Sequence, residues 1–474
     1  MALGQLTLTI GKENFVVGMS TSDNTDNGGF SPRSDAVNLI ASPGVLYQPA
    51  QPTDKSTNVV GEIIASSEDP QLLGADRVLV DDEGNYYSWN GTTVSLERTD
   101  ATNPSGYVAG KTDMEAFDGS VFTSTSETIV KWTVDSVFTD DFITGLNASV
   151  PHPLLRFEGY LYFGDGNLLK RIDDASDATP TTILTLDSQQ NIIALGIDPG
   201  SGKMLVSTTQ GLNISDTRAN TNRVGYYDGF SEKFLRVVTV EDMVTAFWNS
   251  GGQVVVGYGP RIGEFTGSGI SLLRELNVGF DNNELPYKQH GCFIGETFYL
   301  IEQGSILAFG DVIPGQKVFY YAFKNNVNSN DLTHICNLGQ NVLGMAFATD
   351  KFYTWSVTSV STSNTQTFYS NKYEFEDDVW IRKIRIFWDS AITNNVDPGS
   401  LSIISENGVE TSIGQSGLID LRNTTGGTIY WTELADRTGF SNVKLSTLQI
   451  RLILDTVNPG IRKMVVYYDP ANLT

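Results

Sequence analysis

The chain has 474 residues, enough for about two to four domains, and it carries 31 Lys and Arg against 55 Asp and Glu, a formal net charge of −24. This balance excludes a basic stripe that would neutralise nucleic-acid phosphates, and a hydrophobic content of 40% with 11% aromatic residues excludes a disordered chain. No apolar run approaches the roughly 18 residues that span a bilayer, and two cysteines cannot build a disulfide framework.

The first 55 residues differ from the rest and are predicted to form an N-terminal arm. Residues 1–10 alternate polar and apolar side chains without a basic segment or a continuous apolar segment, which indicates a strand and not a signal peptide. We therefore expect the protein to be made in a cytosol. Residues 21–33 hold too few apolar side chains to form a core, so we expect them to order against another surface.

Between residues 56 and 370 the sequence repeats a hairpin, in which two apolar or aromatic runs flank a turn of Gly, Asp or Asn. Long helical periodicity is absent from this span, and several copies are followed by a further strand. The copies lie at residues 77–89, 115–123, 155–163, 194–206, 245–256, 292–301 and 344–354.

The spacing of these hairpins predicts the fold. Successive turn centres lie 35, 40, 41, 51, 44 and 55 residues apart, and blade-type repeats of four strands recur at roughly 40–50 residues. We predict an all-β chain with a seven-bladed β-propeller over residues 56–370, and we keep six blades and a set of stacked β-sandwiches as alternatives. The arm near Gly44–Tyr47 is the candidate for a strand that helps to close the ring.

The pattern changes after about Phe368, where longer strands with period-two alternation lose the blade spacing. Residues 379–387 alternate in this way, and Asn407-Gly408 joins two further strands as a favoured hairpin turn. We predict a separate C-terminal β-sandwich over residues 371–474. It also concentrates bases beside aromatic residues on an acidic chain, and such a patch can meet an acidic partner; the alternative is that the bases solvate one sheet face. The residues concerned are Arg382, Lys383, Arg385 and Trp388.

The motifs of common catalytic and binding sites are incomplete. Gly200–Lys203 resembles the end of a phosphate loop, but Met204 stands where Ser or Thr is required. Asp23–Gly28 resembles the start of a calcium loop, but Ser34 stands where its terminal Glu is required. None of the three histidines lies near a nucleophile elbow, and His152, between two prolines, is expected to shape a loop. We predict no catalytic, cofactor-binding or metal residues.

One pattern leaves a metal hypothesis open. Both cysteines and two of the three histidines occur as His-X-Cys, at His290 with Cys292 and at His334 with Cys336. Residues two apart share a face of a strand, so two such strands could present four zinc ligands. The alternative is that the cysteines are small apolar residues of core strands.

Parts of the sequence resemble β-propeller virion proteins of tailed viruses. Pro32–Leu46 is similar to their lead-in to the first blade, and Gly159–Leu168 is similar to their blades. Thr367–Phe375, leading into Ile381–Ile386, is similar to the junction where such proteins add a sandwich. The resemblance covers most of the chain with loose patterns. It implies a structural role at the tail or the head-to-tail neck, as a hub, nozzle or stabilising plug, and it supplies no catalytic residues.

Three functions follow as hypotheses. The preferred one is a non-enzymatic virion protein, made in the host cytoplasm, oligomeric in the particle, and joined to portal, adaptor or tail components through its arm and its sandwich. We expect no tight nucleic-acid binding, no membrane span and no cofactor. The alternative is a host-surface or glycan-binding propeller, for which loop aromatics at Tyr226, Tyr227 and Trp248 would stack on sugars. A propeller glycosidase is the third, although the chain lacks the repeated Asp boxes of that class.

Overall fold

The computed structural model describes 22 stretches of the chain, and the chain divides into two compact units. One unit comprises residues 53–304 and 326–355, and the other comprises residues 1–52, 305–325 and 356–474. Among the described residues, no helix is long and apolar enough to cross a membrane. The described residues are 6–10, 37–38, 46–47, 52–68, 77–102, 104–133, 137–211, 221–250, 252–276, 286–302, 304–313, 316–323, 332–359, 366–370, 372–393, 396, 398–404, 410–411, 419–421, 427–434, 443–454 and 459–470, where single omitted positions divide some of the stretches.

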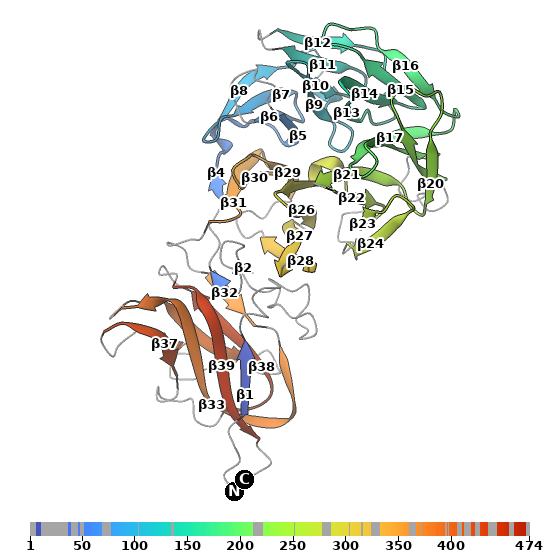
Figure 1. Cartoon of the computed structure of the whole chain (residues 1–474). Coiled ribbons are helices and arrows are strands. Elements are labelled where there is room, and N and C mark those ends of the chain that lie inside the picture. The colour runs from blue at the N-terminus through green and yellow to red at the C-terminus, as the bar shows by residue number, and fades with distance from the viewer. Residues whose placement is uncertain are drawn as a thin grey trace. The chain divides into compact units, whose positions relative to one another are not determined.

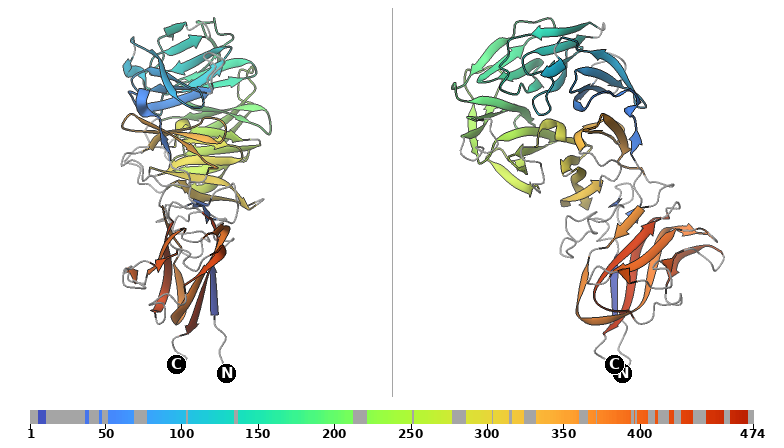
Figure 2. Two further views of the ribbon diagram at one scale, coloured as in Figure 1. Left: turned by 90° about the vertical axis from the view of Figure 1, so that its left-hand side faces the viewer. Right: turned by 180° about the vertical axis from the view of Figure 1, so that it is seen from behind.

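Seven antiparallel sheets of four strands each follow one another along the chain. The first strand of each sheet contacts the first strand of the next, and the seventh contacts the first, so the sheets form a closed ring (Figures 1 and 2). This arrangement is a seven-bladed β-propeller. The prediction from the hairpin spacing is confirmed, and the six-bladed ring and the stacked sandwiches are excluded.

The first four blades span residues 63 to 240, and their strands are given from the ring axis outward. They are β5 (Ile63–Glu68), β6 (Arg77–Asp81), β7 (Asn85–Trp89) and β8 (Val94–Thr99); β9 (Met114–Phe117), β10 (Ser120–Ser124), β11 (Ile129–Thr133) and β12 (Phe138–Ile143); β13 (Leu154–Phe157), β14 (Tyr160–Asp165), β15 (Leu168–Ile172) and β16 (Thr181–Thr185); and β17 (Asn191–Asp198), β18 (Lys203–Thr209), β19 (Asn222–Tyr227) and β20 (Arg236–Val240).

The last three blades complete the ring, and three short 3-10 helices are described beside the blades. The strands are β21 (Val244–Ser250), β22 (Gln253–Tyr258), β23 (Arg261–Phe265) and β24 (Ile270–Glu275); β25 (Gly291–Ile294), β26 (Thr297–Glu302), β27 (Ser305–Ile313) and β28 (Gln316–Phe323); and β29 (Leu332–Asn337), β30 (Val342–Phe347), β31 (Lys351–Ser356) and β4 (Thr53–Asp54), with η2 (Ser56–Asn58), η3 (Pro104–Gly106) and η5 (Lys288–His290).

The ring is closed by a strand that precedes the first blade in sequence. Strand β4 pairs with β31, where Tyr353 lies opposite Asp54, and it supplies the outer strand of the seventh blade. The expectation that Gly44–Tyr47 closes the ring is wrong, because Leu46 lies opposite Ile461 of the C-terminal sheet. The strand that closes the ring must pair with β31 in blade seven, and the chain must then continue directly into blade one. Strand β4 meets both requirements because it lies just before β5 in the sequence.

Burial is greatest in the second and third strands of the blades and least in the outer strands, which explains which strands the sequence revealed. Residues 85–89 of β7 and 120–124 of β10 are entirely buried, since neighbouring blades cover both faces of these strands. Outer strands such as 181–185 of β16 and 270–275 of β24 are mostly exposed or half-buried. The apolar runs that identified the hairpins are therefore the inner and middle strands of the blades.

The uneven spacing of the predicted hairpins also has a structural cause. Five of them join the first and second strands of a blade, as Gly119 does between β9 and β10. The first and last join the second and third strands, at Gly84 and Asp350. This shift shortens the first spacing and lengthens the last. The Gly200–Lys203 segment is the turn between β17 and β18, as expected from its place in a hairpin.

The remaining strands form one hydrogen-bonded network of eleven strands, here called the C-terminal sheet. Strand β33 pairs with β37, β38 and β39, while β38 also pairs with β32 and β34, so the two halves of the network are joined between β33 and β38. The strands are β1 (Leu6–Ile10), β2 (Val37–Asn38), β3 (Leu46–Tyr47), β32 (Gln366–Tyr369), β33 (Tyr373–Ile392), β34 (Gly399–Ile404), β35 (Glu410–Thr411), β36 (Ile419–Asp420), β37 (Ile429–Glu433), β38 (Val443–Leu454) and β39 (Ile461–Pro470).

Both halves of the C-terminal sheet face a single apolar core. Ile384 and Ile386 of β33 pack in one buried cluster with Leu448 and Ile450 of β38, together with Ile10 of the N-terminal strand β1. Strand β1 pairs along its whole length with β39. The N-terminal strand is thus part of this sheet. The Asp23–Gly28 segment lies outside the described residues.

Candidate functional site

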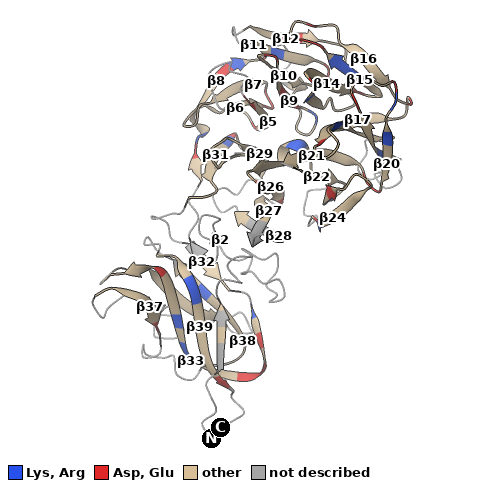
Figure 3. Cartoon of the chain, viewed as in Figure 1, with Lys and Arg blue, Asp and Glu red and all other residues tan. Residues whose placement is uncertain are grey.

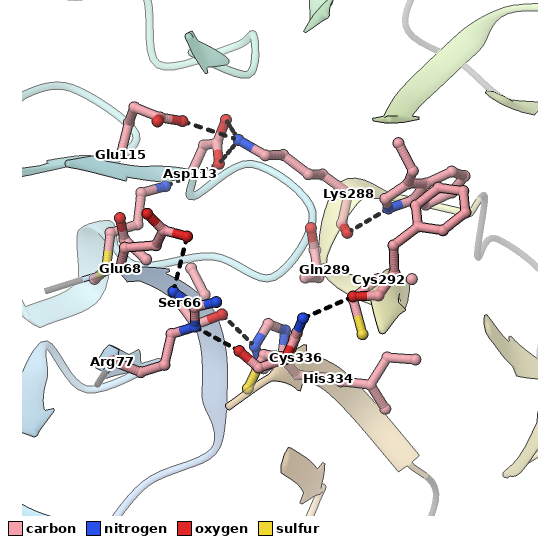
Figure 4. Close-up of a pocket in the computed structure, with 18 of the residues that line it drawn as sticks. Ser66, Glu68, Arg77, Asp113, Glu115, Lys288, Gln289, Cys292, His334 and Cys336 are labelled. Carbon is pink, nitrogen blue, oxygen red and sulfur yellow. Dashed lines mark hydrogen bonds and ion pairs between the residues drawn. The ribbon is translucent and has the colours of Figure 1, made fainter. Parts of the chain in front are cut away.

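The candidate site is a cavity of about 360 Å³ at the axis of the propeller, shown in Figure 4. Its walls come from the first strands of blades one, two, five, six and seven, which converge because they form the inner wall of the ring. Helix η5 adds Lys288 and Gln289 to the lining. The side chains that carry chemistry are Ser66, Glu68, Arg77, Asp113, Glu115, Lys288, Gln289, Cys292, His334 and Cys336.

Helix η5 and the residues just before it, here called the axial plug (residues 286–290), lie against four of the inner strands, β5, β21, β25 and β29. The Nε1 of Trp248 donates to the Lys288 carbonyl at 2.9 Å, and the hydroxyl of Thr245 donates to the Pro286 carbonyl at 2.9 Å. A Cβ atom added to Gly257 would lie 2.6 Å from that same Pro286 oxygen. The glycine therefore permits the plug to approach the fifth blade.

The charged group of Lys288 connects the axial plug to blade two. Its Nζ lies 2.9 Å and 3.1 Å from the two carboxylate oxygens of Asp113 and 3.7 Å from Glu115. Asp113 also accepts the backbone N–H of Leu154 in blade three at 2.9 Å. Burial raises the pKa of Glu115 to about 7, although Lys288 opposes the shift. One lysine thus links the plug to two carboxylates, one of which titrates near neutral pH.

Polar side chains tie neighbouring blades together around the cavity. The amide nitrogen of Asn249 donates to the Ile197 carbonyl of the preceding blade at 2.8 Å, and that of Asn337 donates to the Phe293 carbonyl at 2.8 Å. The two asparagines occupy similar places near the ends of β21 and β29. The Nε of Arg77 in turn donates to the Asn337 carbonyl. These bonds satisfy carbonyl groups at the axis and fix the blades relative to one another.

The sulfur and imidazole groups of the cavity are held in their neutral forms. Burial raises the pKa of Cys336 to about 11 and raises the pKa of Cys292 as well, so neither thiol ionises near neutral pH. Burial lowers the pKa of His334 to about 3, and its Nε2 lies 3.1 Å from the Ser66 hydroxyl. A nucleophilic cysteine requires a thiolate, and a general base near neutral pH requires a matching pKa. This environment opposes both.

The zinc hypothesis is wrong for these residues. His334 and Cys336 lie two apart on β29 and both line the cavity, as the period-two argument predicted. His290, however, lies in η5 and not on the strand that carries Cys292, so the second pair does not share a strand face. Within the described part of the chain, no group of three or more His, Cys, Asp or Glu side chains could hold a metal ion.

The aromatic residues proposed for sugar stacking are not exposed in loops. Tyr226, Tyr227 and Trp248 are strand residues and are buried in the propeller, so they are not loop aromatics that stack on a sugar. His152 is fully buried, with its two ring nitrogens 3.0 Å and 3.2 Å from the carbonyl oxygens of Gly164 and Ser126. It links strand β14 to the turn at Ser126, and it lies in a loop as expected from the sequence.

The predicted bases of the C-terminal sheet occupy its outer surface, but Trp388 does not. Trp388 is buried in the core, and its Nε1 donates to Thr432 at 3.0 Å. Arg382 pairs with Asp469 at 2.7 Å, while Lys383 and Arg385 both pair with Glu433 of β37. The patch therefore consists of bases and neighbouring carboxylates. The aromatic residue predicted for it, Trp388, is not part of it.

Sequence analysis missed the axial plug and its partners. Asp113 and Glu115 have the period-two spacing that places two carboxylates on one strand face, which is a weak signal. Lys288 carries no local signal, because its role depends on the contacts of η5 with the inner strands of other blades.

Comparisons with known proteins give a likeness of fold. No family model and no curated protein matches the chain. Among solved structures, the chain is similar to streptogramin B lyase, with 10% identity over 64% of this chain and 96% of that chain and a TM-score of 0.47. It is also similar to a chain of the mitotic checkpoint complex, with 12% identity over 66% and 92% of the two chains and a TM-score of 0.44. The WD40 domain of Neurospora crassa Pan2 matches at 10% identity over 63% and 90%, with a TM-score of 0.44.

The functions of those proteins are not carried over to this chain, since all three TM-scores lie below 0.5. The fold of this chain is assigned from its own structure. The strand order, the closed contacts of the inner strands and the plug at the axis are the observations used. The chain is a seven-bladed β-propeller with an additional C-terminal β-sheet.

Proposed function

We propose that the protein is a non-enzymatic structural component of a tailed-virus particle, located at the tail or the neck as a hub, nozzle or stabilising plug. The observation that supports the non-enzymatic part is the axial plug, because its Lys288 and Gln289 line the axial cavity and the plug is fixed against the inner strands. The resemblance of the sequence to β-propeller virion proteins supports the location.

The chemistry of the axis supports a structural role. Lys288 is paired with carboxylates, the thiols are protonated and His334 is neutral, so the cavity favours stability over proton or group transfer. The first strands of neighbouring blades contact one another around the whole ring, and such a ring of blades leaves only short, protected sheet edges for pairing with other chains. Attachment to portal, adaptor or tail proteins then falls to the other parts of the chain.

The charge of the protein fits a position beside DNA. With 31 bases against 55 acids, the surface repels the phosphate backbone and would let DNA pass without adhering. A filter-binding assay at low salt is expected to show no appreciable affinity for duplex DNA, and micromolar binding would contradict this part of the proposal.

The location is tested on virus particles. Particles produced by the genome that encodes the chain are purified and analysed by mass spectrometry, and the protein is expected in tail or neck fractions in a fixed ratio to the portal protein. Its absence from particles would overturn the proposal.

A plug variant tests the link between the axis and assembly. Lys288→Met removes the ion pair with Asp113, and we expect fewer particles to incorporate the protein than with the exposed-lysine control Lys351→Met. If the two variants are incorporated equally, the ion pair of the axial plug is not needed for assembly into particles.

A further inference from the structure

One outer face of the C-terminal sheet combines cations with aromatic rings, and Figure 3 shows basic positions along strands of this sheet. Strand β33 is flanked there by β37 on one side and β39 on the other, with Phe387 opposite both Trp431 and Lys463. We call this surface the cation–aromatic face. It consists of Lys383, Arg385, Phe387, Trp431, Lys463 and Tyr467.

The cations of this face lie over its rings. The Arg385 guanidinium lies 4.6 Å from the ring centroid of Trp431 and 5.8 Å from that of Tyr467. Lys383 lies 4.5 Å from the Tyr467 centroid, and Lys463 lies 4.5 Å from that of Phe387. Stacking of this kind holds long side chains in place before a partner arrives, which reduces the entropy lost on binding.

The edge of the face exposes large apolar side chains. Trp431 is 47% exposed and its neighbour Tyr430 is 61% exposed, both on β37. Among the described strands, β37 pairs with β33 alone. Trp, Tyr and Arg are the residues that contribute most to protein interfaces, and an edge strand with exposed aromatics is a typical contact surface.

The charge of the face differs from that of the remaining chain. Its bases, with Arg382 and Arg462 beside them, face the carboxylates of Asp389, Glu433 and Asp469, an excess of two positive charges. Residues 371–474 contain 10 bases and 13 acids, whereas residues 1–370 contain 21 bases and 42 acids. A positive face on such a protein is complementary to the protein's own propeller.

One rim of the propeller carries six exposed carboxylates and few exposed bases. Strands alternate in direction within a blade, so the turns between strands one and two and between strands three and four share one rim of the ring. Lys233 is the exposed base in the described parts of these turns. The exposed carboxylates there, which we call the acidic rim, are Asp118, Glu158, Asp173, Asp174, Glu232 and Glu296.

We propose that the cation–aromatic face docks on the acidic rim of a second copy of this chain. The proposal rests on the assembly role given above and names one partner for it. Because the contact joins two different surfaces, it is heterologous, and repetition produces a closed ring of copies or an open chain of them. Trp431 supplies the apolar centre of the contact, and Arg385 and Lys463 direct it toward carboxylates.

Sedimentation velocity of the full chain over a range of concentrations tests the proposal. The wild-type protein is expected to form oligomers at low salt that dissociate as salt is added, because the contact is largely electrostatic. Arg385→Glu and, separately, Lys463→Glu are expected to weaken association at least tenfold. Lys463 is exposed, so its variant tests the face even if Arg385→Glu impairs folding.

Two controls make the result specific. Lys351→Glu changes an exposed base outside the face by the same charge and is expected to leave association unchanged. Glu232→Lys with Glu296→Lys reverses charge on the rim, and it is expected to weaken association alone and to restore it when mixed with Lys463→Glu protein.

A wild-type protein that is monomeric at every concentration, or face variants that associate normally, would overturn the docking proposal. Either result leaves the particle analysis untouched, so failure of this proposal is distinguishable from failure of the virion role.

Discussion

The propeller and the C-terminal sheet are both antiparallel β structures, yet they bury their strands in different ways. Residues 85–89 of β7 are buried on both faces, since a neighbouring blade covers each of them. Strand β33 buries Ile384, Ile386 and Trp388 while Arg385 and Phe387 between them remain partly exposed. The middle strands of a blade therefore have no free face for a partner, whereas the C-terminal sheet has one core face and one outer face.

The two regions also place their charges differently. The propeller brings Lys288, Asp113 and Glu115 to its axis, where they connect the plug to the blades. The C-terminal sheet keeps Lys383 and Arg385 on its surface, paired with Glu433 and stacked on rings. Charges at the axis stabilise one structure, and charges on the outer face remain accessible for association.

The largest expected effect compares a core tryptophan with a surface tryptophan of the C-terminal sheet. Trp388→Ala removes a buried ring and its hydrogen bond to Thr432, so we expect the free energy of unfolding of this sheet to fall by about 3–5 kcal/mol. Trp431→Ala removes a ring that is 47% exposed and should cost less than about 1 kcal/mol. Urea unfolding followed by circular dichroism measures both, and equal losses would show that the outer face is part of the core.

A smaller effect is expected where the plug meets the fifth blade. Gly257→Ala places a Cβ 2.6 Å from the Pro286 carbonyl, and we expect a loss of about 1–3 kcal/mol because backbone must shift. Gly269→Ala is the matched control, since a Cβ there meets no atom within 4 Å. Thermal unfolding of the two variants decides the point. If both variants unfold at the wild-type temperature, the plug is not held closely against the blade.

The pH dependence of stability should reveal Glu115. Its pKa in the folded protein is about 7 and its ordinary value is 4.5, so between these values the folded state holds a proton that the unfolded state has released. Stability from this group is full below about pH 4.5 and decreases as the pH rises toward 7. Glu115→Gln should remove this decrease, so its unfolding temperature, relative to wild type, should rise between pH 5 and 8. A constant difference over that range would contradict the raised pKa.

The smallest effect is expected from His334. Its contribution to stability changes with pH in the opposite direction to that of Glu115. Its pKa is about 3 in the folded protein against an ordinary value of 6.5, so the unfolded state binds the extra proton between these values. Stability from this group is full above pH 6.5 and is lost as the pH falls toward 3. His334→Gln should therefore lose less stability than wild type on acidification from pH 6.5 to 5. Parallel unfolding curves for the two proteins would show that His334 is not the buried neutral group described here.

Much of the fold could be predicted from the sequence because it depends on local patterns. The apolar runs around Gly119 and Gly159 specify hairpins, and in both turns the residue before the glycine also has a positive φ, as a two-residue hairpin turn requires. The alternation in residues 379–387 likewise indicates a strand with one core face. These signals act between residues near one another in the chain.

The rest was decided by contacts between distant residues. The pairing of Thr53–Asp54 with β31, of β1 with β39 and of Lys288 with Asp113 joins segments separated by 175 to several hundred residues, and no spacing in the sequence encodes such distances. His290 and Cys292 show the same limit, because a 3-10 turn at His290 broke the period-two rule that their spacing implied. Sequence determined the blades through side-chain periodicity, while closure of the ring determined which polar groups met at its axis.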